Sequence, residues 1–155
     1  MEDRTKNLSR PEIDDFLKSQ KVGLLSLTDG QSSYSIPLGY SYDGKNIGIT
    51  IRNEGRKMAY INKNRNVCFV VYWIPEGFGM QKMAYKSVIC DGKLERVTDP
   101  EDITKTVRNS EKHMGLPEGA WDNLLEMTLK SPENSFFWRI RLTDVGGKSV
   151  EDAKK

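Results

Sequence analysis

Apolar residues along this chain fall into separate blocks whose spacing changes from strand-like to helix-like and back. Blocks rich in Val, Ile, Leu and aromatic residues, bounded by Gly, Asp and Pro, are typical of β-strands. They predict six strands, over residues 22–28, 34–42, 46–52, 66–73, 85–97 and 136–142. The pairs Asp29-Gly30 and Asp43-Gly44 favour tight turns between the first three strands.

Several details refine this strand pattern. The run 66–73 is apolar almost without interruption, which is typical of a strand buried on both faces. Asp91-Gly92 predicts a bulge within the long strand 85–97, and Gly146-Gly147 predicts a turn after the last strand. Pro37 has no N–H group, so we expect it at a sheet edge or bulge, beside something other than a strand, such as a ligand.

Helical spacing of apolar residues predicts four helices, and the first opens with a capping box, Ser9-Arg10-Pro11-Glu12. The helices are expected at about 9–20, 55–64, 99–114 and 117–129. The segment 74–83 contains proline and glycine and is predicted to be a flexible loop.

The order of these elements predicts an α+β domain with peripheral helices. A chain of 155 residues can bury one sizeable core, so we expect 1–155 to form a single domain. Six antiparallel strands with few helices favour a small β-barrel.

The local pattern with the most chemical content runs from Thr50 to Lys57. The strand that ends at Thr50-Ile51 is followed by Arg52, Arg56 and Lys57, with the last two at the start of a predicted helix. Cations oppose the positive end of the helix dipole, and the first N–H groups of a helix have no partner within it. A bound anion would resolve this conflict, so the segment predicts a phosphate pocket for a cofactor.

The alternative for the same segment is a solvated basic turn. In that interpretation Asn53 caps the helix and Glu54 is a first-turn acid that balances the neighbouring cations. The segment by itself leaves both interpretations open.

The composition narrows the class of protein. The chain has 24 Lys and Arg against 22 Asp and Glu, a net charge of +2 that does not indicate nucleic-acid binding. No apolar run reaches the length of a membrane span, and the charged N-terminus does not resemble a signal peptide. We therefore expect a cytoplasmic protein with no membrane partner, whose Cys68 and Cys90 are buried free thiols.

The chain has no recognisable set of catalytic side chains. Its one histidine, His113, is expected to be a solvated surface residue, and no residues have metal-ligand spacing. No nucleophile elbow, Walker loop or dinucleotide-binding glycine turn is present, so no catalytic residue is assigned. If the protein is an enzyme, a bound cofactor should supply the reactive atoms.

Motifs spread over residues 8–149 resemble the pyridoxamine 5'-phosphate oxidase-like FMN-binding split barrels, above all their nitroimidazole-resistance subgroup. The similarity lies in the order and spacing of several short motifs. They are Leu8-Ser9-Arg10-x-Glu12-Ile13-x-x-Phe16-Leu17, Val22-Gly23-x-Leu25, Ile36-Pro37-Leu38-x-Tyr40, Gly55-Arg56-Lys57 with Ile61, Asn64 and Val67-Cys68-Phe69, Tyr85-Lys86-Ser87-Val88-x-x-x-Gly92, and Gly147-Lys148.

The resemblance implies a six-stranded antiparallel split β-barrel that forms a homodimer, with two FMN sites at the subunit interface. Arg56 and Lys57 would then bind the FMN phosphate. The residues expected along the isoalloxazine ring are Pro37, Leu38, Thr50 and Ile51, with Tyr85 and Ser87 facing the site from one of the subunits. Charge and strand-end position add Arg52 and Trp138 to this expected cofactor site.

Two departures from the family pattern bear on function. Relatives often have His or Ser with small residues before the Gly-Arg-Lys run, whereas this chain has Thr50-Ile51-Arg52. The bulkier residues would reshape the edge of the flavin site, so a flavin bound there is either FMN or a related flavin. The Arg-x-His substrate motif of true pyridoxamine phosphate oxidases is absent, since Trp138-Arg139-Ile140-Arg141 stands near the C-terminus. This argues against vitamin B6 oxidation.

Three functions remain in competition. The first is an oxidoreductase whose FMN passes electrons from a reduced nicotinamide or another small donor to a small acceptor, such as a nitro-aromatic compound. The second is a protein that binds a flavin, a deazaflavin or haem for storage or sensing. The third is a structural dimer without a ligand.

Overall fold

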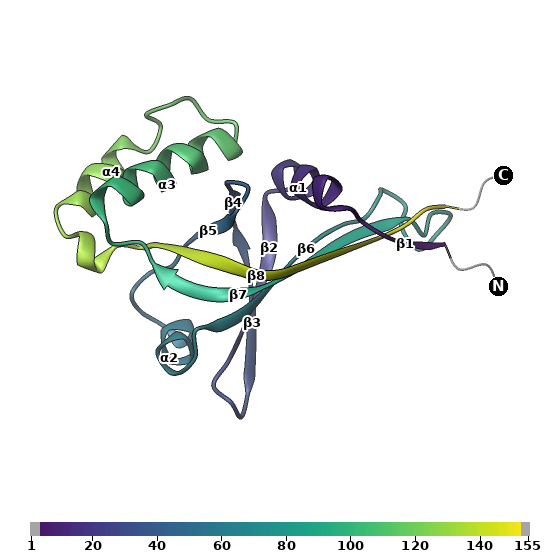
Figure 1. Ribbon diagram of the computed structural model, residues 1–155, viewed down its shortest axis with the longest axis horizontal. Helices are drawn as coiled ribbons and strands as arrows, with labels where there is room; N and C mark the ends of the chain where they lie inside the picture. The colour runs from purple at the N-terminus through teal and green to yellow at the C-terminus, as the bar shows by residue number, and fades with distance from the viewer. Residues whose placement is uncertain (1–3, 153–155) are drawn as a thin grey trace.

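The computed structural model describes residues 4–152 (Figure 1). In chain order its elements are β1 (Thr5–Asn7), α1 (Arg10–Ser19), β2 (Val22–Thr28), β3 (Ser33–Gly39), β4 (Ser41–Tyr42), β5 (Asn46–Thr50), α2 (Arg56–Lys63), β6 (Asn66–Trp73), β7 (Tyr85–Arg96), α3 (Pro100–His113), α4 (Asp122–Leu129), the 3₁₀-helix η1 (Pro132–Asn134) and β8 (Phe137–Val150).

All the strands belong to one antiparallel sheet in the order β3-β2-β6-β7-β8-β5-β4, with β1 also paired to β8. The edge strands β3 and β4 are joined by the single residue Tyr40. A link this short requires the sheet to curl until its two edges approach each other. The expected α+β split barrel is therefore confirmed.

The predicted number of six strands was wrong, because the sheet has eight. The predicted strand 34–42 breaks at Tyr40, whose N–H donates to Lys21 O and whose hydroxyl donates to Leu17 O at 2.6 Å. These two bonds fix the point where the chain passes between the sheet edges. The added strand β1 has no apolar alternation, and its pairing with β8 depends on a partner more than 140 residues away.

The turn predicted at Gly146-Gly147 is also wrong, because β8 continues through both glycines to Val150. A Cβ at Gly147 would lie 2.9 Å from Leu8 and 3.1 Å from Ile13. The glycine therefore allows the start of α1 to pack closely on the strand. In contrast, the bulge predicted at Asp91-Gly92 is confirmed by a register shift there.

The helices follow their local signals with one exception. The capping box of α1 is present, because the Ser9 hydroxyl accepts from Glu12 N–H and the Glu12 carboxylate accepts from Ser9 N–H. The helix predicted from Pro117 begins only at Asp122. Gly119 has a φ of 96°, which is outside the helical region, so the chain turns before it becomes helical.

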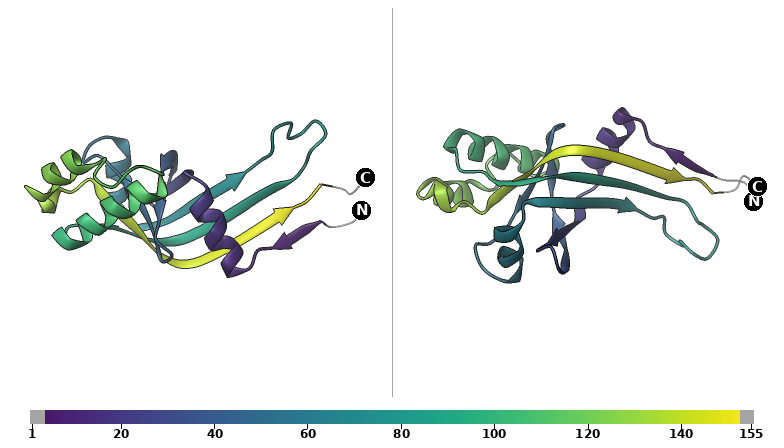
Figure 2. Two further views of the ribbon diagram at one scale, coloured as in Figure 1. Left: turned by 90° about the horizontal axis from the view of Figure 1, so that it is seen from above. Right: turned by 60° about the horizontal axis from the view of Figure 1, so that its bottom comes forward.

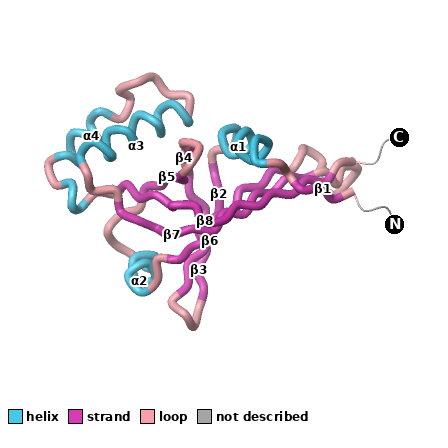
Figure 3. Tube along the Cα trace, in the orientation of Figure 1, coloured by secondary structure: helices cyan, strands magenta, loops and turns pink. Residues whose placement is uncertain are grey.

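Two apolar clusters form the core. The larger lies inside the curled sheet under α1 and α2, and the smaller joins α3 and α4 to the sheet through Val97, Ile103, Val107, Leu125 and Phe137. Figures 2 and 3 show α2, α3 and α4 around one end of the sheet and α1 nearer its middle, while β6, β7, β8 and β1 extend away from them as an arm. The tip of the arm is the loop 74–84, which confirms the predicted loop.

The expectation that His113 is solvated was wrong. Its half-buried ring donates from Nε2 to Gln20 O at 2.7 Å and accepts from Tyr42 N–H at Nδ1, at 3.3 Å. It also lies 5.1 Å from the ring of Tyr40. Burial, and then the charge of Lys21, hold the pKa of His113 below its ordinary value, and the bond to Gln20 offsets part of this effect. His113 thus joins α3 to the crossing between β3 and β4.

This arrangement predicts that acid weakens the fold through His113. The pKa of His113 is lower in the folded chain than the value of about 6.5 expected in the unfolded chain, so folding favours the neutral ring. Its contribution to stability is complete above the unfolded pKa and is lost as the pH falls through the folded pKa. Urea unfolding at pH 7.5 and pH 5.0 should show a smaller loss of stability on acidification for His113→Gln than for the native chain. Equal losses would contradict this prediction.

Candidate functional site

The basic turn before α2 has no internal cap. The residue before the helix is Gly55, with a φ of 93°, and neither a capping side chain nor a first-turn acid is present. Asn53 instead accepts a hydrogen bond from Arg96 Nη1 and donates to Asn134 O. The alternative interpretation, in which Asn53 caps the helix and Glu54 lies in its first turn, is therefore wrong.

The cations of this turn have no acidic partner. Within residues 4–152, Arg52, Arg56 and Lys57 form no ion pair. Arg52 and Arg56 are exposed and Lys57 is half-buried. No atom lies within 4 Å of the place that a Cβ would take at Gly55. Free N–H groups, the helix dipole and unpaired cations therefore meet at an open surface, which suits a phosphate group.

An aromatic stack holds the side chain of Arg56. Its guanidinium carbon lies 4.5 Å from the ring centre of Tyr34 and 5.8 Å from that of Tyr60, and the two rings stack 5.5 Å apart. The Tyr60 hydroxyl hydrogen-bonds to Ser32 and to Arg56, and these bonds lower the pKa of Tyr60. The stack connects the start of α2 to β3, the strand that carries Pro37.

Pro37 and Leu38 lie side by side on β3 but face different ways. The expectation that Pro37 occupies a sheet edge is confirmed, since β3 is an edge strand. Pro37 pairs with Leu24 and is exposed, whereas the half-buried Leu38 packs against the larger core cluster. An edge strand has one row of backbone groups without a strand partner, so β3 can offer hydrogen bonds to a planar ligand.

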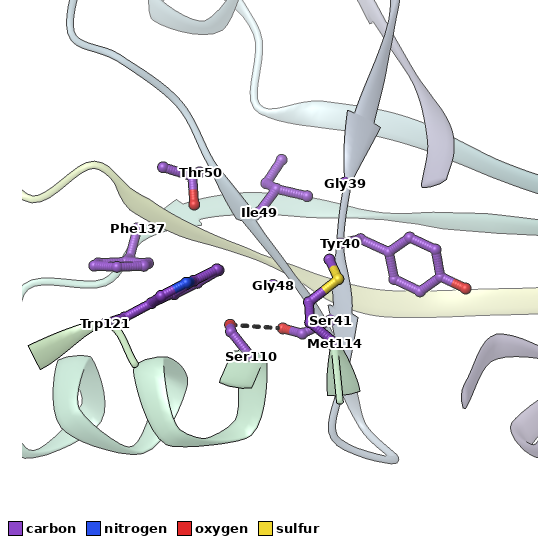
Figure 4. Close-up of a pocket in the computed structure, with 10 residues that line it drawn as sticks. All are labelled: Gly39, Tyr40, Ser41, Gly48, Ile49, Thr50, Ser110, Met114, Trp121 and Phe137. Atoms are coloured by element: carbon purple, nitrogen blue, oxygen red, sulfur yellow. Dashed lines mark hydrogen bonds between the residues drawn. The ribbon is translucent and has the colours of Figure 1, made fainter. Parts of the chain in front are cut away.

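Thr50 is the last residue of β5 and Ile51 follows it directly. These two neighbours also differ in exposure. Ile51 is fully buried, whereas Thr50 is exposed and pairs with Phe137. Thr50 also lines the small pocket of Figure 4 between β5 and α3, in which Ser110 donates a hydrogen bond to Ser41. The pocket measures about 30 Å³, room for one or two water molecules and too small for a flavin ring.

Tyr85 and Ser87 lie at the start of β7, on the arm, where they pair with Val150 and Lys148 of β8. Figures 1 and 2 show this end of β7 far from α2. Within one chain these two residues are therefore not brought together with Arg56.

Trp138 lies one residue inside the start of β8 and is fully buried. Its ring enters the barrel interior beside Arg65 and Arg96, whose guanidinium carbons are 4.9 and 4.6 Å from the ring centre. Its contact with a cofactor stays a prediction.

One face of the sheet carries apolar side chains that stay exposed among residues 4–152. Its central row consists of Pro37, Leu24, Val70 and Ile89, which pair across β3, β2, β6 and β7. We call the surface around this row the open face, and its exposed members include Val22 and Tyr72. A hollow of about 490 Å³ lies beside it, lined by Ser19, Gln20, Lys21, Val22, Tyr72, Trp73 and Ile74.

The prediction that 66–73 is buried on both faces is wrong for the single chain. Residues alternate between buried and half-buried along β6, and Tyr72 and Trp73 are exposed. The sequence contains the signal for the open face, because a run that is apolar on both sides indicates two covered faces. It does not show that the second cover must come from outside the chain.

Other chemistry within the described chain is sparse. Cys90 is a buried free thiol, and burial raises its pKa to about 12, whereas Cys68 is half-buried rather than buried as expected. No group of His, Cys, Asp and Glu side chains among residues 4–152 could hold a metal ion. In the same part of the chain, no helix is long and apolar enough to cross a membrane.

Comparison with solved structures shows the same fold in several proteins. A candidate 5-nitroimidazole antibiotic resistance protein from Bacteroides thetaiotaomicron is 17% identical, with a TM-score of 0.76 over 97% of this chain and 91% of that chain. An FAD-binding protein from Mesorhizobium loti is 24% identical, with a TM-score of 0.65 over 96% of this chain and 98% of that chain. An FAD and heme binding protein from Mycobacterium smegmatis is 13% identical, with a TM-score of 0.72 over 99% of this chain and 77% of that chain.

No curated protein matches this sequence. A family model described as pyridoxamine 5'-phosphate oxidase matches residues 9–149, nearly the whole chain, and confirms the resemblance found in the sequence motifs. The chain therefore belongs to the pyridoxamine 5'-phosphate oxidase family.

Proposed function

We propose that this protein binds FMN, with the phosphate on Arg56 and Lys57 and the ring system along β3 at Pro37 and Leu38. The observation that carries the proposal is the start of α2, where two cations, a glycine and uncapped N–H groups have no acidic partner in the described chain. Arg52 adds a third cation to this turn.

Proteins of similar structure support a flavin as the ligand. Two similar proteins are called FAD-binding, and a third is called FAD and heme binding. A single phosphate-binding turn suits the one phosphate of FMN, whereas FAD has two. A His-ligated haem is less suited to this chain, because its one histidine, His113, has both ring nitrogens engaged in hydrogen bonds.

We further propose that a second copy of the chain completes the site. Tyr85 and Ser87 lie at the start of β7, the end of this strand that is far from α2, and no part of residues 4–152 covers the apolar open face. A two-fold pair would bury this face in both copies and let the arm of one copy approach the cofactor turn of the other. The homodimer thereby accounts for both the divided site residues and the exposed apolar strands.

The proposed activity is an oxidoreductase that takes electrons from a reduced nicotinamide or another small donor. When bound, FMN supplies the electron transfer, and the protein holds the cofactor and orients the reactants. Among the proposed site residues no side chain is suited to be an acid or base near neutral pH, so protons come from water or from the substrate. A small nitro-aromatic compound is the proposed class of acceptor. A cytoplasmic location would supply reduced nicotinamide and keep both thiols free.

Binding without turnover is the second candidate function. The lack of an acid or base among the proposed site residues favours it, because storage or sensing needs only tight association. A deazaflavin would occupy the same phosphate turn.

The absorbance spectrum of the freshly purified protein, followed by release of its chromophore, tests the proposed cofactor. We expect a yellow protein that releases FMN. A colourless protein that takes up no added FMN would refute flavin binding. Turnover of the loaded protein with reduced nicotinamide and a panel of nitro-aromatic acceptors then tests the activity, and tight stoichiometric binding without turnover would support the second candidate.

A further inference from the structure

Trp138 lies at the centre of a cluster of cationic side chains at one end of the barrel. Arg65 stands directly before β6 and Arg96 is the last residue of β7. Their guanidinium carbons lie 4.9 and 4.6 Å from the centre of the Trp138 ring. Both arginines are half-buried, and the tryptophan ring between the strands is fully buried.

Several donors in this cluster have no acceptor. The indole Nε1–H of Trp138 is buried and makes no hydrogen bond to any residue of the described chain. Arg96 donates only from Nη1, to Asn53 Oδ1 at 2.5 Å and to Ser135 O at 2.7 Å. Arg65 donates no hydrogen bond from its side chain to any of residues 4–152. Buried donors are nearly always paired, so the indole N–H points to an acceptor from outside the chain, and the two half-buried arginines beside it have donors left to share that acceptor.

The charges of the cluster are also unbalanced. Two other half-buried arginines have carboxylate partners: Arg108 pairs with Glu111, and Arg139 pairs with Glu95. Within the described chain neither Arg65 nor Arg96 has one. Burial, and then repulsion from Arg65, lower the pKa of Arg96. An anion would relieve this repulsion.

We propose that Arg65, Arg96 and the indole N–H of Trp138 form an oxyanion site that binds a phosphate group. Guanidinium groups match phosphate oxygens in geometry and keep their charge when half-buried, and the indole supplies one further directed donor. This site is separate from the turn at Arg56 and Lys57, and it does not depend on the proposed flavin function.

A hydrogen-bond chain connects this oxyanion site to the cofactor turn. Arg96 donates to Asn53, and Asn53 donates to the backbone oxygen of Asn134 at 2.9 Å. Asn53 belongs to the segment between β5 and α2, which carries Arg52. A phosphate that holds Arg96 in place therefore also holds the segment that leads into the cofactor turn.

Nitrogen-15 NMR of the indole N–H groups tests the proposal directly. The chain has three tryptophans, so three indole signals are expected, and Trp138→Phe identifies the one from Trp138. Titration of the native protein with inorganic phosphate at constant ionic strength should shift this signal saturably. Arg65→Gln should weaken the apparent affinity at least about 10-fold, because one of the charge-assisted contacts is lost. Lys112→Gln, a matched control that removes an exposed cation in the last turn of α3, should leave the affinity unchanged.

Three outcomes would overturn the proposal. They are no phosphate-dependent shift of the Trp138 signal, an equal shift from chloride alone, or the same affinity in Arg65→Gln as in the native chain. The double variant Arg56→Gln with Lys57→Gln should keep the phosphate response, and its loss would show that no separate site exists. A failed flavin test with an intact phosphate response would refute only the proposed function.

Discussion

Replacement of Arg56 and Lys57 together by alanine should weaken FMN binding at least about 100-fold, because two charge-assisted contacts to the phosphate are lost. Both side chains stand at the uncapped start of α2 without an acidic partner in the described chain. The helix dipole and N–H groups remain in the variant, so weak binding should persist. Quenching of flavin fluorescence during titration of the cofactor-free protein measures the change.

The matched control removes two cations that lie away from the proposed phosphate. Lys63 is at the far end of α2 and Lys112 is in the last turn of α3, and both are exposed. Alanine at these two positions lowers the net charge equally but should change FMN affinity less than about threefold, since exposed charges at a distance are screened by salt. Equal weakening in both double variants would show that the effect comes from net charge rather than from a phosphate contact.

Local signals in the sequence were sufficient for most helices and for the bulge. The capping box at Ser9 and Glu12 fixed the start of α1, because both of its hydrogen bonds lie within four residues. The bounds of α2 agree with the prediction to within one residue at each end. Asp91-Gly92 predicted the bulge in β7, where a Cβ at Gly92 would lie 2.5 Å from Arg141 O.

Long-range packing accounts for the errors. A pair of glycines predicts a turn when only the neighbouring residues are considered. At Gly147, however, a side chain would collide with Leu8, which is far away in sequence and packs against this position. The predicted start of α4 was wrong for a similar reason. The buried carboxylate of Glu111 accepts a hydrogen bond from Trp121 N–H at 2.8 Å and holds the residues before Asp122 in a turn. Neither contact can be deduced from spacing.

The candidate site also has a part that local sequence signals predict and a part that depends on long-range contacts. The basic turn at Arg56 was visible because the relevant charges, glycine and helix start are adjacent in sequence. The cluster of Arg65, Arg96 and Trp138 was not visible, because its members come from three separated segments and meet only when β6 pairs with β7 and β7 pairs with β8. The open face was missed because apolar strand residues predict burial without identifying what covers them.

Substitution of Ile89 by aspartate should separate the proposed dimer into monomers. Ile89 is 50% exposed in the single chain and lies in the central row of the open face, between Val70 and Gly146. In a two-fold interface each substitution appears twice, so two unpaired carboxylates would have to be buried. At about 2 kcal/mol or more for each, the dissociation constant of the dimer should rise at least about 1,000-fold. Sedimentation velocity over a range of concentrations measures this change.

Met127→Asp is the matched control, because Met127 is 62% exposed on α4, away from the open face. It introduces the same charge in place of an exposed apolar side chain and should leave the dimer intact. The decisive comparison is FMN affinity in the two variants. If Tyr85 and Ser87 of one copy complete the site of the other, Ile89→Asp should lose FMN binding together with the dimer, although Arg56 and Lys57 are unchanged. Monomers that bind FMN as tightly as the native protein would show that one chain holds the whole cofactor site.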